Sequence, residues 1–269
     1  MIDQDRYWQE QIHKIMPDLQ IRQLILHEEG LVNAVLIVNN EWVVRFTKTD
    51  WGKELMELEY RLLCHLQSKL SLSIPEPVKH AEGVIAYPHL SGESFVRETW
   101  LAAPTEKKQA LADQLGEFLC QLHHIKTGDL DWEIPPTLAP VSRETWVDIY
   151  ERLVEKIYPL LLPHQVDWVE NLFDPLLTDE DYFAFDPALI HGDLAPFHIL
   201  YDRQEERLNG VIDFGTSGMG DPATDLGNLI CSYGEVLVDR LRATYDDFDN
   251  QIHRARFYAQ AIELHWALL

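Results

Sequence analysis

The segment from residue 189 to residue 225 restricts the fold of this chain more than any other part of the sequence. Within it, two apolar runs at residues 197–201 and 208–214 flank a charged turn at residues 202–207. Two apolar runs joined by a short polar turn predict a β-hairpin with a loop at each end. Because the hairpin is short, its two outer loops can meet at one end of it.

These two loops carry side chains suited to chemistry. The sequence HGD occupies residues 191–193, DFG occupies residues 213–215, and His198 lies five residues beyond Asp193. Two carboxylates and an imidazole at one end of a hairpin suit metal-dependent group transfer, in which one acid accepts a proton and the other anchors a cation. Asp and Gly are also ordinary turn residues, so either motif alone would fit a structural role about as well. Their occurrence together favours the functional interpretation.

The motifs also resemble those of a known family. HGDL at residues 191–194, IDFG at residues 212–215 and GDPATDL at residues 220–226 are similar to the motifs of the aminoglycoside phosphotransferases, small-molecule kinases with a protein-kinase-like fold. The resemblance extends from about residue 30 to about residue 269. It implies a bilobal α+β fold and the transfer of a phosphoryl group to a hydroxyl, but it is a poor guide to the acceptor.

The resemblance divides the chain into two lobes and a hinge. Residues 1–87 would form an N-terminal nucleotide-binding lobe with a small antiparallel β-sheet and one main helix. Residues 88–93 would form the hinge, and residues 94–269 a larger, mostly helical catalytic and substrate-binding lobe that carries the hairpin. Strand-like runs between Leu19 and Phe46 agree with this division. Apolar spacing predicts helices over residues 3–16, 54–70, 106–125, 143–161, 165–177, 222–230, 234–243 and 249–269.

By resemblance, the turn at residues 28–33 would cover the nucleotide phosphates. Arg45 on a strand and Glu59 on the next helix would form the ion pair that holds the α- and β-phosphates. Protein kinases use Lys where this chain has Arg, whose planar fork also suits phosphate; a basic strand residue taken alone more often lies on a solvated face. The chain has neither a GxGxxG nor a Walker A pattern, which argues against a Rossmann or P-loop site.

The hinge is the expected site of purine binding. In the resembling kinases, backbone N–H and C=O groups bind the base here, and the best candidates are Tyr87, Pro88, His89 and Leu90. A simple turn between strands is the structural alternative, and the residues alone leave both open. They also leave open whether ATP or GTP is the donor.

The resemblance assigns roles to the hairpin loops. Asp193 would accept or orient the proton of the acceptor hydroxyl, and Asp213 would bind Mg²⁺. His198 stands where the wider kinase pattern has Asn; aminoglycoside 2″-phosphotransferases and macrolide phosphotransferases resemble this chain there and often favour GTP. Because Mg²⁺ prefers oxygen and imidazole suits softer metals, His198 either binds metal through nitrogen or contacts phosphate or water. His191 and Asp225 are expected to support the catalytic loop.

Composition limits the partners and the compartment. The sequence contains 22 Lys and Arg residues and 45 Asp and Glu residues, which gives a formal net charge of −23. Such a charge repels nucleic acid and anionic membranes and attracts cationic molecules. Cys64, Cys120 and Cys231 are odd in number and widely spaced, which predicts buried free thiols in a reducing compartment. With no long apolar run and no signal-peptide pattern, we expect a cytoplasmic protein without a membrane or nucleic-acid partner, a monomer or a dimer.

The leading hypothesis is a small-molecule kinase that transfers the γ-phosphoryl group of ATP or GTP to a hydroxyl of an antibiotic, an aminoglycoside or a macrolide. A role in antibiotic resistance would follow. The alternatives are a metabolic kinase for a sugar or an amino alcohol, and a non-catalytic pseudokinase-like binding module. Asp193 and Asp213 argue against the last, and His198 keeps it open. Acidic candidates for the acceptor pocket are Glu235, Asp246, Asp247, Asp249 and Glu263.

Overall fold

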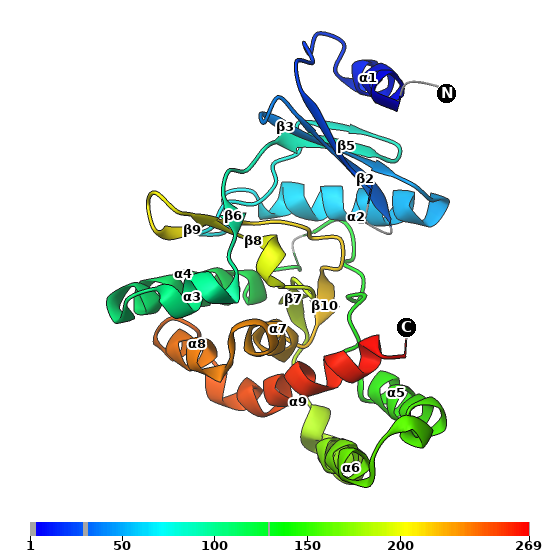
Figure 1. Cartoon of the computed structure of the whole chain (residues 1–269), viewed down its shortest axis with the longest axis vertical. Helices are drawn as coiled ribbons and strands as arrows, with labels where there is room; N and C mark the ends of the chain where they lie inside the picture. Colours follow the sequence, from blue (N-terminus) through cyan, green and yellow to red (C-terminus); the bar gives the residue numbers. More distant parts are fainter. Residues whose placement is uncertain (1–3, 29–31, 129, 269) are drawn as a thin grey trace.

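The computed structural model describes residues 4–28, 32–128 and 130–268, and it shows a bilobal α+β molecule (Figure 1). One lobe contains a five-stranded sheet, and the other is mostly helical. The fold class predicted from the sequence is therefore confirmed. In the turn predicted to cover the phosphates, residues 29–31 lie outside the described residues.

An antiparallel meander forms the sheet of the N-terminal lobe, as predicted, with the strand order β1-β2-β3-β5-β4. Between β2 and β3, Asn39 and Asn40 have φ angles of 57° and 55°. Two consecutive positive φ angles are typical of a type I′ hairpin turn, which Asn tolerates. The strands are β1 (Leu24–His27), β2 (Asn33–Val38), β3 (Trp42–Thr47), β4 (Lys79–Ala81) and β5 (Val84–Pro88).

Two helices lie on opposite sides of this sheet (Figure 1). The helix α2 (Asp50–Leu66) lies between the sheet and the helical lobe, and α1 (Gln4–Ile15) lies on the outer side. The helix predicted over residues 54–70 begins four residues earlier because Thr49 caps it, accepting a hydrogen bond from the amide of Gly52 at 3.0 Å. It also ends earlier than predicted, at Leu66.

In the helical lobe, α7 and α9 pack against each other, and α4 packs against α8. The predicted helix over residues 143–161 ends at Lys156, and a 3₁₀ turn at Tyr158–Leu160 follows, because Pro159 has no N–H to donate. The short helix α3 was not predicted. The helices are α3 (Arg97–Ala102), α4 (Thr105–His123), α5 (Arg143–Lys156), α6 (Pro163–Thr178), α7 (Ala223–Tyr233), α8 (Glu235–Arg240) and α9 (Phe248–Trp266).

The predicted hairpin is confirmed, with shorter strands than the apolar runs suggested. It consists of β8 and β9, and β6 pairs with β8 on its other side. A second antiparallel pair, β7 with β10, was not predicted, because three-residue strands carry too little periodicity. Together the pairs bring the loops on both sides of the hairpin to the lobe interface. The strands are β6 (Glu93–Ser94), β7 (Ala188–Ile190), β8 (Ile199–Asp202), β9 (Arg207–Val211) and β10 (Gly218–Gly220).

The cysteines are free thiols, as expected. The prediction that they are buried is wrong. Cys64 is exposed, because it lies on the solvent-facing side of its helix, in line with Asp50 and Glu57, and Cys120 and Cys231 are partly exposed. Among the described residues, no helix has the length and apolarity needed to cross a membrane.

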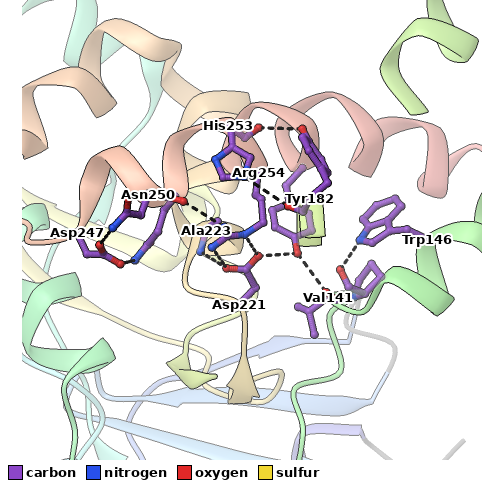
Figure 2. A network of polar contacts seen from close by, with 12 residues as sticks. Val141, Trp146, Tyr182, Asp221, Ala223, Asp247, Asn250, His253 and Arg254 are labelled. Carbon is purple, nitrogen blue, oxygen red and sulfur yellow. Dashed lines mark hydrogen bonds and ion pairs between the residues drawn. The ribbon is translucent and has the colours of Figure 1, made fainter. Parts of the chain in front are cut away.

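A buried ion pair fastens α9 to the turn that precedes α7 (Figure 2). The carboxylate of Asp221 accepts hydrogen bonds from Nε and Nη2 of Arg254 at 2.7 and 3.1 Å. It also accepts from the amide of Ala223 and from the hydroxyl of Tyr258, both at 3.0 Å. Since a buried carboxylate is costly unless its partners are present, this network fixes the position of α9.

We predict that Arg254→Met lowers the free energy of unfolding by about 3–5 kcal/mol, because it leaves the charge of Asp221 buried without its partner. The matched control is Arg256→Met on the same helix, where the side chain is 51% exposed and pairs with Glu235. An exposed pair contributes at most about 1 kcal/mol. Urea unfolding followed by circular dichroism measures both variants, and equal losses would contradict the role given to Arg254.

Candidate active site

The loop at residues 191–193 is held by the buried carboxylate of Asp225 on α7. The amides of His191 and Gly192 each donate to one of its oxygen atoms at 2.8 Å. The imidazole of His123 on α4 lies 3.1 Å from the same carboxylate. Burial would raise the pKa of Asp225, but the hydrogen bonds from the two histidines lower it below its ordinary value. The loop is therefore anchored on an ionised group.

His191 connects the two loops of the hairpin. Its Nδ1 accepts a hydrogen bond from the amide of Asp193 at 3.3 Å, so Nε2 carries the proton and donates to the carbonyl oxygen of Ile212 at 3.1 Å. The hydroxyls of Thr216 and Ser217 donate to the carbonyl oxygen of His191 at 3.0 and 3.1 Å. Burial lowers the pKa of His191, which agrees with a neutral ring.

Glycine is required at position 192. Its φ angle is +82°, which L side chains rarely adopt. A Cβ atom there would lie 2.8 Å from Oγ1 of Thr137 and 3.1 Å from the carbonyl oxygen of Thr216. The loop can pass this close to the neighbouring chain only without a side chain at Gly192.

Arg45 and Glu59 meet between the lobes. Nη1 of Arg45 lies 2.5 Å from Oε1 of Glu59, and Nη2 lies 3.7 Å from Oδ1 of Asp213. The side chains of Arg45 and Glu59 are 7% and 2% exposed. Burial alone would lower the pKa of Arg45, but the carboxylate of Glu59 raises it above its ordinary value. A fixed positive charge thus lies beside Asp213.

His198 bridges the two candidate carboxylate residues. Its Nδ1 lies 2.7 Å from the backbone carbonyl oxygen of Asp193, so Nδ1 is protonated and donates. Its Nε2 then faces Oδ2 of Asp213 at 3.4 Å. Burial would lower the pKa of His198, but its contact with Asp213 raises it above its ordinary value.

Asp213 remains ionised in this setting. Burial would raise its pKa, but the hydrogen bond from His198 and the charge of Arg45 hold it well below its ordinary range. The side chain is still 48% exposed. Asp213 therefore presents a charged carboxylate to the space between the lobes.

Asp193 lies where two cavities meet. One cavity of about 400 Å³ lies between the lobes and is lined by Arg45, Glu59 and Asp213. The other, of about 510 Å³, lies within the helical lobe. Asp193, Leu138 and Thr216 line both. Asp193 is the one ionisable side chain among these three, and it can therefore face ligands in both cavities.

The segment predicted to be the hinge offers fewer backbone donors than the sequence suggested. Pro88 has no amide N–H, and the amide of His89 donates to the carbonyl oxygen of Glu41 at 2.9 Å. The side chain of Tyr87 is buried in the core. The amide of Leu90 and the carbonyl oxygens of this segment remain as candidates for contact with a purine.

Most acidic candidates for the acceptor pocket lie elsewhere. Of the five named from the sequence, Glu263 lines the cavity in the helical lobe, together with Asn228 and Trp266, which sequence reasoning missed. Glu235 pairs with Arg256 and Asp249 with Arg242 instead. The positions of the acidic residues in the sequence did not indicate which face of each helix lines the cavity. Asn228 could have been found from helical spacing, because it lies one turn after Asp225 on α7.

We predict that Asp225→Asn lowers the free energy of unfolding by about 3 kcal/mol, because the amide nitrogen of Asn cannot accept the hydrogen bond that one carboxylate oxygen accepts now. Asp249→Asn is the control, since the side chain of Asp249 is 82% exposed. Chemical unfolding of both variants provides the comparison. A loss below about 1 kcal/mol for Asp225→Asn would show that the loop does not depend on this charge.

The model of the phosphotransferase enzyme family (APH) matches residues 24–258. Viomycin phosphotransferase of Streptomyces vinaceus is 25% identical over 248 residues, which cover 89% of this chain and 83% of that protein. The match to the family model spans most of the chain and includes Arg45, Asp193 and Asp213, whereas Glu263 and Trp266 lie beyond it.

Solved structures share the fold. The GDP complex of wild-type aminoglycoside 2'-phosphotransferase-IIIa superposes with a TM-score of 0.83 at 26% identity, covering 99% of this chain and 91% of that one. Macrolide 2'-phosphotransferase MphH from Brachybacterium faecium gives a TM-score of 0.73 at 22% identity, with 98% and 91% covered, a likeness of fold alone. Because the family model matches residues 24–258, well over half of the chain, this chain belongs to the phosphotransferase enzyme family.

Proposed function

We propose that this protein is a small-molecule kinase that transfers the γ-phosphoryl group of ATP or GTP to a hydroxyl of an antibiotic or a similar compound. The position of Asp193 at the junction of the two cavities carries the proposal. A nucleotide in the cavity between the lobes and an acceptor in the other would meet at this carboxylate. Residues 1–87 would then be the nucleotide-binding lobe, 88–93 the hinge and 94–269 the catalytic lobe.

The names of the similar proteins support this assignment. The compared structure of an aminoglycoside phosphotransferase is a GDP complex, and the curated relative is named as a viomycin phosphotransferase. A metabolic kinase would use the same catalytic residues. The antibiotic and the metabolic acceptor are therefore distinguished by the shape and polarity of the acceptor cavity. Because the donor is an intracellular nucleotide, we place the reaction in the cytoplasm.

Phosphoryl transfer asks the protein for position and charge more than for covalent chemistry. The acceptor oxygen forms a bond to the γ-phosphorus while the bond from that phosphorus to the β–γ bridging oxygen breaks. Asp193 would orient the hydroxyl and accept its proton. Arg45, fixed by Glu59, would hold the α- and β-phosphates. The products are the phosphorylated acceptor and a nucleoside diphosphate.

The residues present fit Mg²⁺. Among the described residues, no cluster of three or more His, Cys, Asp or Glu forms a metal site by itself. Mg²⁺ in kinases uses one or two carboxylates and completes its shell with phosphate oxygens and water. Asp213, ionised and half exposed, is such a ligand. Bound there, Mg²⁺ would neutralise charge on the phosphates.

We predict that Asp193→Asn lowers kcat about 10²- to 10⁴-fold, because a positioned base is lost. Nucleotide affinity should change little, since Asp193 does not bind the phosphates in this account. Coupled nucleotide turnover gives kcat, and calorimetric titration gives the nucleotide Kd. Equal turnover in the parent and the variant would rule out Asp193 as the base.

The role of His198 can be tested through the metal. His198→Asn replaces a nitrogen ligand with a carbonyl oxygen. Mg²⁺ prefers oxygen ligands more strongly than Mn²⁺ does. If His198 ligates the metal, the ratio of kcat/KM with Mg²⁺ to that with Mn²⁺ should rise about tenfold in the variant. An unchanged ratio would show instead that His198 positions Asp193 and Asp213 without touching the metal.

A further inference from the structure

The cavity beside Asp193 has largely apolar walls. One wall is the loop of Leu138, Ala139 and Pro140, and another is α9 with Trp266. The side chains at the rim remain uncovered: Trp266 is 63% exposed and Leu138 is 52% exposed. Phe197, on the turn that precedes β8, adds a third, 60% exposed. Large apolar groups gathered at the mouth of a cavity indicate a ligand with an apolar surface of its own.

The cavity contains little charge, although the chain as a whole is strongly acidic. Among the described residues that line it, Asp193 and Glu263 are the carboxylates, and Lys or Arg do not occur. Burial lowers the pKa of His265, which also lines the cavity, and this favours the neutral form of its ring. With Asp193 assigned to the hydroxyl, one carboxylate remains to bind a positive charge. The net charge of −23 therefore does not describe this cavity.

Asn228 on α7 supplies an unused donor. Its side-chain nitrogen Nδ2 is buried and has no hydrogen-bond partner in the described chain. The residue lines the cavity one helical turn after Asp225. A buried amide without a partner costs free energy, and an oxygen atom of a bound ligand would remove that cost.

The walls are fixed before any ligand binds. The ion pair of Asp221 with Arg254 sets the position of α9 (Figure 2). The hydroxyl oxygen of Tyr258 on the same helix lies 3.2 Å from the carbonyl oxygen of Val141, next to the loop that forms the opposite wall. A preformed cavity loses little entropy on binding and selects by shape and polarity.

We propose that the acceptor is an amphipathic molecule with a single ammonium group, and not a polycationic aminosugar; this rests on the proposed kinase function and narrows its substrate. The ammonium group binds Glu263, and an oxygen atom accepts from Asn228. The apolar face of the acceptor lies against Trp266 and Phe197, with a hydroxyl toward Asp193. A polycation would leave most of its charges in an apolar cavity without partners, which is costly.

The test compares two acceptors and three variants. Erythromycin carries one amine and a large apolar ring, and kanamycin carries several amines on a small polar frame. We expect kcat/KM for erythromycin to exceed that for kanamycin at least about tenfold. Glu263→Gln should raise KM for erythromycin about tenfold, with a smaller effect on kcat, through loss of a charge-assisted hydrogen bond. The matched control Glu117→Gln, at an exposed acid on α4, should leave KM unchanged.

A second variant keeps the test independent of charge. Trp266→Ala removes an exposed side chain, which the fold does not require, and should also raise KM for erythromycin. The inference is overturned if kanamycin is the better substrate, or if neither variant changes KM. It is also overturned if neither compound is phosphorylated while slow hydrolysis that depends on Asp193 persists, a result that leaves the kinase proposal standing. Absence of all nucleotide binding would overturn both.

Discussion

The carboxylate of Asp225 joins parts of the chain that are far apart in sequence. It accepts two amides from the loop at residues 191–193 and lies against His123, about seventy residues before that loop. A buried carboxylate is stable only when such donors surround it, so α4, α7 and the loop must assemble together. The orientation of Asp193 follows from this, because its own amide is then fixed by the ring of His191.

The second constraint is the charge between the lobes. Arg45 from the sheet and Glu59 from α2 are nearly completely buried, and both lie close to Asp213 of the helical lobe. Removing Arg45 would leave the carboxylate of Glu59 buried without its partner, which is costly. The guanidinium group of Arg45 and the exposed part of the Asp213 carboxylate line the same cavity. The cavity therefore suits an anion that is bound together with a metal cation.

Local patterns in the sequence predicted part of the fold. The hairpin followed from two apolar runs and a polar turn, and the turn at Asn39 and Asn40 from the tolerance of Asn for positive φ. The β7–β10 pair and α3 were too short to produce periodicity. The contact of His123 with Asp225, and the choice of Glu263 among five acids, depend on how helices pack, which a single sequence does not encode locally.

In the proposed reaction, Asp213 holds the metal of a nucleotide in the cavity between the lobes, and Asp193 faces the terminal phosphate from the junction of the two cavities. A crystal structure with Mg²⁺ and a non-hydrolysable ATP or GTP analogue tests this most directly. The account predicts a metal bound to the carboxylate of Asp213 at about 2.1 Å, with the terminal phosphate toward Asp193. A nucleotide bound outside the cavity between the lobes, or a metal that does not touch Asp213, would contradict it.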